Sequence, residues 1–133
     1  MAIYKDFNIA FTPDPYSRDL QVVSDNAAVG QSIRSLVLTM FYERPFQPSI
    51  GSIISRLLFE PLTAITESLL VTTIRDVIVK FEPRASLRYV SLYTDVGPNG
   101  EPLDDHTLVV EVGFAIFNLP GISSTTFVLR RLR

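Results

Sequence analysis

A change in hydrophobic period at Pro83 constrains the fold of this chain more than any other feature. Upstream of it, apolar residues recur at helical spacing, namely Leu62, Ile65, Leu69, Ile74, Val77, Ile78 and Phe81. Downstream of it, apolar residues alternate as they do in a strand. Proline cannot donate a helical hydrogen bond, and it drives the residue before it out of the helical conformation. The sequence therefore predicts a helix that opens with Pro61 and stops at Glu82, followed by a sheet.

The C-terminal third predicts an antiparallel meander of strands. These strands cover about 86–96, 107–117 and 125–132, and an Asn-Gly pair in the turn region 97–105 favours a hairpin. The middle strand, TLVVEVGFAIF, has one apolar face made of Leu108, Val110, Val112, Phe114 and Ile116. Such a face must be covered, so we expect helices on one side of the sheet.

The N-terminal segment predicts one or two short strands. Residues 3–11 alternate, and the apolar positions on one side are Ile3, Phe7, Ile9 and Phe11. Residues 20–23 have the composition of a brief strand, and the two prolines between these segments predict a loop. We expect the N-terminal strand to join the C-terminal meander in one antiparallel sheet.

Two further helices are predicted before the long one. The first covers about 26–41, with Ser24 or Asp25 as its N-cap. Its apolar face consists of Ile33, Leu36, Val37 and Met40. The second is a short helix in the segment 52–59. The predicted fold class is therefore α+β, a single domain over 1–133 with two to three helices packed on one face of an antiparallel sheet.

Composition excludes several classes of protein. The 133 residues are 47% hydrophobic and 20% charged, which is typical of a globular domain. A formal charge of −2 argues against a nucleic-acid partner, and the absence of cysteine excludes disulfides and thiolate metal sites. No apolar run approaches the roughly 18–20 residues of a membrane span, and the N-terminus does not resemble a signal peptide. We expect a soluble protein without a membrane partner, made in the cytoplasm.

Catalysis has little support in the sequence. The single histidine, His106, stands at the end of a loop, and adjacent residues of LDDHTL would point to opposite sides of an extended chain, so no metal site is predicted. A glycosidase needs two carboxylates that flank one sugar. Spacing selects no such pair among Glu43, Glu60, Glu67, Glu82 and Glu111. We expect no catalytic residue, no metal and no cofactor.

The segment FEPR is the first of three candidate contact sites. A carboxylate at a helix C-terminus is disfavoured by the helix dipole, so Glu82 needs a reason to be there. Arg84 carries a rigid fork of donors that suits a carboxylate or a cluster of carbonyls. Glu82 and Arg84 either pair with each other or are held by Pro83 toward another chain. The residues alone leave both alternatives open.

The other two candidates are a proline-rich loop and the last strand. The loop ERPFQP contributes Glu43, Arg44, Pro45 and Phe46. It is either a stiff solvated loop or a docking element that loses little entropy on binding. The segment LRRLR carries Arg130, Arg131 and Arg133. These charges either protect a sheet edge from aggregation or select a partner strand that adds to this edge.

Four segments taken together resemble the family of small baseplate wedge proteins of contractile-tailed, T-even-like phages. The segments are RPFQPSIG, LLFEPLT, FEPR and HTLVVEVGFAI, and their order and spacing match over about residues 20–120. The wider family includes the corresponding baseplate component of type VI secretion systems. The Glu-Pro-Arg signature is specific because it coincides with the upstream Arg-Pro-Phe loop and the downstream strand.

The resemblance implies a structural part of the inner baseplate wedge in the virion tail. It implies that Glu82, Pro83 and Arg84 contact the helical core bundle formed by larger wedge proteins. It also implies that a strand pairs with the tail sheath protein by β-strand addition and so starts sheath assembly. Here that strand would carry Phe127, Leu129, Arg130 and Arg131. Six copies per baseplate, assembled in the host cytoplasm, would follow.

The chain departs from the family at Tyr42, where many members have a glycine, and this puts the backbone shape of the docking loop in question. Two other functions remain as alternatives. The family also resembles a bacterial anti-adaptor that blocks delivery of a sigma factor to a protease, which would make the chain a regulatory binding module. The family has further carried a lysozyme label, which would make it a muramidase.

Overall fold

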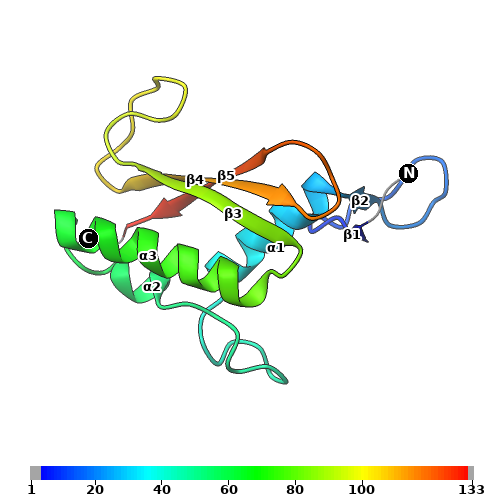
Figure 1. Ribbon diagram of the computed structural model, residues 1–133, viewed down its shortest axis with the longest axis horizontal. Coiled ribbons are helices and arrows are strands. Elements are labelled where there is room, and N and C mark those ends of the chain that lie inside the picture. Colours follow the sequence, from blue (N-terminus) through cyan, green and yellow to red (C-terminus); the bar gives the residue numbers. More distant parts are fainter. Residues whose placement is uncertain (1–3, 132–133) are drawn as a thin grey trace.

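The computed structural model describes residues 4–131, which form helices and strands of an α+β domain (Figure 1). The elements are β1 (Lys5–Phe7), β2 (Val22–Ser24), α1 (Asn26–Leu38), α2 (Ile54–Leu57), α3 (Ala64–Phe81), β3 (Ala85–Tyr93), β4 (Thr107–Ile116) and β5 (Ser123–Arg130). The predicted fold class is confirmed. No helix within residues 4–131 has the length and apolar character needed to cross a membrane.

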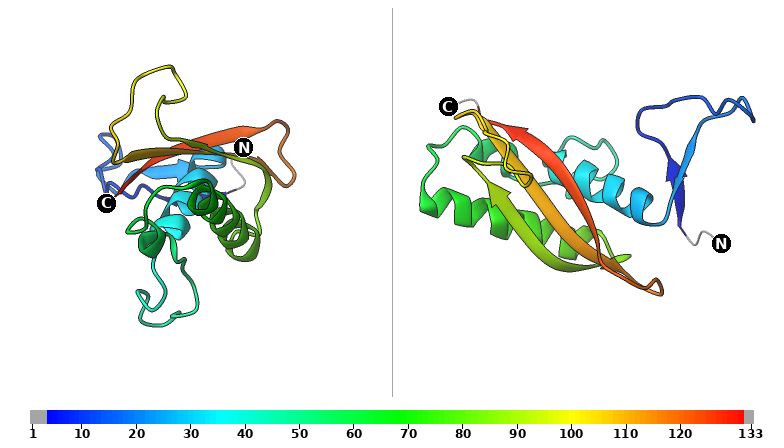
Figure 2. Two further views of the ribbon diagram at one scale, coloured as in Figure 1. Left: turned by 90° about the vertical axis from the view of Figure 1, so that its left-hand side faces the viewer. Right: turned by 90° about the horizontal axis from the view of Figure 1, so that it is seen from above.

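The predicted meander is the antiparallel sheet β3-β4-β5. Strands β4 and β5 pair without a break from Thr107 with Arg130 to Phe114 with Ser123, whereas β3 has a bulge between Leu87 and Tyr89. Helix α3 packs against β3 and α1 packs against β5, so that both helices cover the same face of the sheet (Figure 2). Leu132, the predicted end of the last strand, and the following Arg133 lie outside the described residues.

The core lies between this sheet face and the two long helices. All five residues predicted for the apolar face of β4 are buried, with exposed fractions of 4% or less. Helix α1 contributes Val29, Ile33 and Val37 to the same cluster, and α3 contributes Leu70, Ile74 and Ile78. The period-two pattern of β4 therefore predicted the buried face correctly.

The N-terminal strand does not join the meander, contrary to the prediction. Strand β1 pairs with β2 in a separate two-stranded sheet that extends from one end of the protein (Figure 1). The alternation over residues 3–11 also ends at Phe7, because the Asn8 side chain accepts a hydrogen bond from the Ala10 amide and bends the chain. The predicted position Ile3 lies outside the described residues.

The predicted helix boundaries needed correction at two places. Helix α1 ends at Leu38, not at residue 41, because Thr39 is extended and its amide carbonyl accepts a hydrogen bond from Ser52. Met40 is therefore 47% exposed and not part of a helical face. Helix α3 begins at Ala64, after Pro61, because the Thr63 side chain caps it by accepting the Thr66 amide.

The apolar face of α3 is rotated in its first half relative to the predicted stripe. Ile65 and Leu69 are 74% and 48% exposed, whereas the neighbouring Thr66 and Leu70 are buried. The Thr66 hydroxyl donates to the Pro61 carbonyl, which lets a polar residue occupy a buried position. In the second half of the stripe, Ile74, Val77 and Ile78 are buried as predicted, whereas Phe81 is half-buried.

The loop between α1 and α2 is closed at its base. The Ser52 amide donates to the Thr39 carbonyl and the Ser52 hydroxyl donates to the Val37 carbonyl. Gly51 makes this closure possible, since a Cβ atom there would lie 2.5 Å from the carbonyl carbon of Met40. The loop projects from the body of the protein on this narrow base (Figure 1).

We expect Gly51→Ala to destabilise the protein by about 2 kcal/mol, because the added methyl group meets backbone atoms that cannot move aside. The measurement is the free energy of unfolding in urea. Gly100→Ala is the matched control, since that site has a left-handed φ of 85° and nothing within 4 Å of the added atom. An equal loss in both variants would show that backbone conformation, and not crowding, is the cause.

Candidate interaction site at the end of helix α3

Helix α3 ends where the sequence predicted. Glu82 leaves the helical conformation with φ −119° and ψ 85°, and its amide makes the last helical hydrogen bond, to the Ile78 carbonyl. Pro83 follows, and β3 begins at Ala85. The chain therefore turns from helix to strand within three residues, and the side chains of Glu82 and Arg84 are set by this turn.

Glu82 and Arg84 pair with each other in a buried position. The Arg84 Nε atom donates to Oε1 of Glu82 at 2.8 Å, and Nη2 donates to Oε2 at 3.0 Å. The Ser32 hydroxyl, from α1, donates to the same Oε2 at 2.5 Å. Glu82 is only 2% exposed. The carboxylate thus points inward, and it cannot itself present a charge to another chain.

The Glu82 carboxyl group has a pKa below its ordinary value. Burial by itself raises this pKa, but the hydrogen bonds from Arg84 and Ser32 and the positive charge of Arg84 together outweigh that effect. A carboxylate that stays ionised in this way is unsuited to act as the general acid of a glycosidase, which needs a raised pKa.

Arg84 is the partner of the pair that reaches the surface. Its side chain is 28% exposed, and its guanidinium lies over the Tyr4 ring, 5.7 Å from the ring centre. Its Nη1 group makes no hydrogen bond to any residue within 4–131. The bidentate contact with Glu82 fixes the orientation of the guanidinium, so that its free donors point in one defined direction.

A groove of about 400 Å³ surrounds this guanidinium. It collects residues from the N-terminal segment, α1, the loop after α1 and the α3–β3 turn: Asp6, Ile9, Gln31, Ser32, Ser35, Leu36, Arg44, Ile50, Phe81, Glu82, Pro83 and Arg84. Two of the three predicted sites therefore meet here, since Arg44 of the docking loop and the Glu-Pro-Arg segment line the same groove.

The remaining docking-loop residues lie farther out. Phe46 is 97% exposed at the loop tip, and Pro45 is also exposed. Glu43 is used within the loop, where its Oε2 atom accepts the Met40 amide at 2.8 Å. Tyr42 has a φ of 67°, in the left-handed region that favours glycine. The backbone shape suited to a glycine is therefore kept at Tyr42.

The predicted strand residues lie at the other end of the sheet. Phe127 and Leu129 are buried in the core, so their side chains cannot contact a partner and these two positions offer only their backbone. Arg130 is exposed, whereas Arg131 folds back and donates from Nη1 to the Asp105 carbonyl. The structure therefore brings this third predicted site together with neither of the other two.

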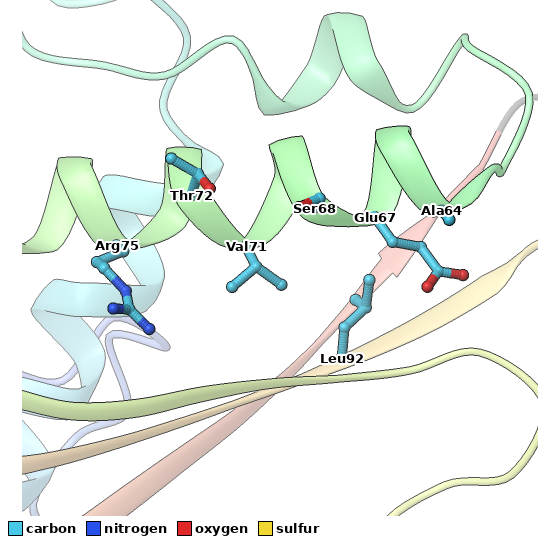
Figure 3. Close-up of a pocket in the computed structure, with 7 residues that line it drawn as sticks. All are labelled: Ala64, Glu67, Ser68, Val71, Thr72, Arg75 and Leu92. Carbon is cyan, nitrogen blue, oxygen red and sulfur yellow. The ribbon is translucent and has the colours of Figure 1, made fainter.

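The two edges of the meander differ. The β5 edge is regular, whereas the bulge near Tyr89 bends the β3 edge, which disfavours addition of another strand there. An open depression of about 700 Å³ follows the β3 side of α3 (Figure 3). It is lined by Ala64, Glu67, Ser68, Val71, Thr72, Arg75 and Leu92, none of which was predicted as a contact residue.

Several polar residues with defined roles were missed by sequence reasoning. On the sheet face away from the helices, the hydroxyl groups of Tyr89 and Tyr93 both donate to the Glu111 carboxylate, and these hydrogen bonds raise the pKa of both tyrosines. Ser32 and Tyr4, which hold Glu82 and Arg84, were also missed. The only sequence signal for these residues was weak: Ser32 is a polar residue next to the apolar face of α1.

No group of three metal-binding side chains occurs within the described part of the chain. His106 is exposed, and its carbonyl accepts the Arg131 amide.

The chain is similar in sequence to one known family. A profile described as "Baseplate wedge protein gp25" matches residues 23–118. The baseplate wedge protein gp25 of Enterobacteria phage T4 is 27% identical over 118 residues, which covers 89% of this chain and 83% of that protein.

Solved structures share the fold at lower identity. A candidate tail lysozyme from Geobacter sulfurreducens has a TM-score of 0.71 at 18% identity, covering 85% of this chain and 97% of that one. A chain of the six-fold symmetrised baseplate of the anti-feeding prophage has a TM-score of 0.68 at 23% identity, covering 86% of each. A chain of the postcontracted pyocin R2 baseplate has a TM-score of 0.54 at 20% identity, covering 79% of this chain and 96% of that one.

We expect the Glu82 carboxylate to make the stability of the protein depend on pH. Its pKa is lower in the folded state, so its contribution is complete above the ordinary value of 4.5 and is lost as the pH falls through the folded pKa. Glu82→Gln should cost about 2 kcal/mol at pH 7 and less at low pH. The measurement is the free energy of unfolding of both proteins between pH 7 and pH 2. A difference that does not change with pH would contradict the assignment.

Proposed function

Because this chain belongs to the family of the baseplate wedge protein gp25, we propose that it is a structural component of the inner wedge of a contractile-tail baseplate. In this role it links the core bundle of the wedge to the tail sheath. The observation that carries the proposal is the oriented guanidinium of Arg84, which lines a groove, has free donors and is held in place by Glu82.

The groove fits a partner that supplies hydrogen-bond acceptors. Arg84 and Arg44 both line it, and the charge of Glu82 is buried behind Arg84, so that Asp6 is the remaining exposed acid. Acidic side chains or the carbonyl groups at the end of a helix would satisfy the two guanidinium groups. A helical core bundle made by larger wedge proteins offers both kinds of acceptor.

A catalytic role has less support from the site. The Glu82 carboxylate is buried and its pKa is lowered, whereas a muramidase needs an accessible acid with a raised pKa. The Glu111 carboxylate is occupied by two tyrosine hydroxyl groups. We therefore propose a structural role and not hydrolysis, although one similar structure is named as a candidate tail lysozyme.

The second contact of the proposed link is the outer edge of β5. This strand has an unbroken register with β4, and its outer edge is unpaired within the described residues. Phe127 and Leu129 anchor the strand in the core, and Arg130 adds a charge beside the edge. We propose that an extended segment of the sheath protein adds to β5, so that the sheet templates the first sheath ring.

Six copies per baseplate suit such a template. The anti-feeding prophage baseplate that contains a similar chain is described as six-fold symmetrised. In a closed ring, each modest contact recurs in every copy, and the contacts reinforce one another because the partners are already held together. The proposed location is accordingly the tail baseplate, after assembly in the host cytoplasm.

We expect Arg84 to be required for wedge assembly. Arg84→Ala alone would leave the buried Glu82 carboxylate without its cationic partner, so the substitution is made in the Glu82→Gln background. Loss of a charge-assisted hydrogen bond should reduce capture by the cognate larger wedge proteins by about tenfold to a hundredfold relative to Glu82→Gln alone. The measurement is co-purification of the wedge complex.

Unfolding temperatures of the two variants provide the control for folding. If the double variant is captured as well as Glu82→Gln, the proposed contact at Arg84 is wrong. If the protein instead captures a bacterial regulator, the anti-adaptor alternative takes its place.

We expect a proline in β5 to block sheath assembly without unfolding the protein. Amide groups of adjacent residues in a strand point to opposite edges, so one of Thr125→Pro and Thr126→Pro removes a hydrogen bond to β4 and the other removes an outward amide. The variant that keeps its stability should still join the wedge but fail to start a sheath. The measurement is sheath formation by electron microscopy, and normal sheaths on this variant would contradict the proposal.

A further inference from the structure

The N-terminal segment 4–24 forms an arm that leaves the body of the protein beside α1 (Figures 1 and 2). Strands β1 and β2 pair only with each other within the described residues. The large apolar side chains of the arm are mostly exposed to solvent: Phe7 57%, Ile9 56%, Phe11 66%, Tyr16 95%, Leu20 38% and Val22 51%. A two-stranded ribbon that exposes this much apolar surface gains little from folding alone.

The arm is nevertheless held in a defined position. The Gln31 side chain of α1 accepts the Ile9 amide at 2.9 Å and donates to the Phe7 carbonyl at 2.8 Å. At the base of the arm, the Tyr4 amide donates to the Asp25 side chain. These contacts orient the exposed apolar surface before any partner binds, which reduces the entropy lost on binding.

The arm and the Arg84 groove form one continuous surface. Ile9 and Asp6 of the arm line the groove together with Arg84 and Arg44. The Tyr4 ring lies under the Arg84 guanidinium. A partner that reaches the donors of Arg84 therefore passes along the arm.

We propose that the arm completes the core-bundle site on its apolar side, with Ile9 packing against the side of a helix whose acidic residues or end carbonyls meet Arg84. This inference rests on the function proposed above. Ile9 lines the groove itself, whereas Phe7 and Val22 lie on the opposite face of the ribbon from Asp6, because adjacent strand residues alternate between faces. An apolar side chain next to the cationic Arg84 and Arg44 matches an amphipathic helix, which presents apolar and acidic residues on adjoining faces.

Strand addition is a poorer use of this arm. Strands β1 and β2 pair over only three positions, from Lys5 with Ser24 to Phe7 with Val22. So short an edge offers few main-chain hydrogen bonds to an added strand. The β5 edge is the longer and more regular one.

The test uses the full chain with the substitution Ile9→Ser, co-expressed with its cognate larger wedge proteins. The Ile9 side chain is 56% exposed, so the unfolding temperature should change little. Capture in the wedge complex should fall at least tenfold. The matched control is Ile65→Ser, a 74% exposed apolar residue at the start of α3, which should be captured normally.

The outcomes separate this inference from the proposed function. If the arm variant is captured normally while the Arg84 variant is not, the arm is no part of the site and the proposed function stands. If both variants are captured normally, the proposed function fails and the inference fails with it. If the arm substitution instead changes the mass of the isolated protein in solution, the arm binds a second copy of this chain and the inference is overturned.

Discussion

The buried carboxylate of Glu82 connects three parts of the fold that otherwise meet through apolar contacts. Glu82 follows the last residue of α3, and its carboxylate accepts a hydrogen bond from Ser32 of α1 and pairs with Arg84, just before β3. Neither the burial nor the unfavourable end of the helix dipole would be tolerated without these donors. Because the carboxylate has to satisfy both donors at once, the turn from α3 to β3 has one orientation, and the direction of the Arg84 guanidinium follows from it.

The parts of the fold that obey local rules were predictable from the sequence. The stop before Pro83 and the buried face of β4 depend on backbone conformation and on alternation, which act over a few residues. The buried face of α3 was harder to predict, because Leu69 and Leu70 are adjacent and equally apolar. The pattern selected Leu69, but the capped start at Thr63 and the satisfied hydroxyl of Thr66 set the buried face at Leu70.

In the candidate site too, features set by neighbouring residues could be predicted from the sequence, and contacts set by tertiary packing could not. The sequence singled out Glu82 and Arg84, and it left open whether they pair or face another chain; they pair, and Arg84 also reaches the surface. Ser32 could not be predicted as their partner, since it lies 50 residues away and its contact depends on how α1 packs on α3. The placement of Arg44 in the same groove, and of the N-terminal strand outside the meander, likewise depends on tertiary packing.

The two proposed contacts lie at opposite ends of one rigid element. Arg84 precedes the β3 residue that pairs with Ile116 at one end of β4, whereas Arg130 pairs with Thr107 at the other end. The ladder between them extends over the length of β4, roughly 30 Å at about 3.3 Å per residue, and helices α1 and α3 support it along one face. A partner bound at Arg84 would therefore fix the position of the β5 edge without any movable joint. In a template for the next ring of subunits, this stiffness matters more than the strength of either contact, because an error in angle at one end is carried to the other.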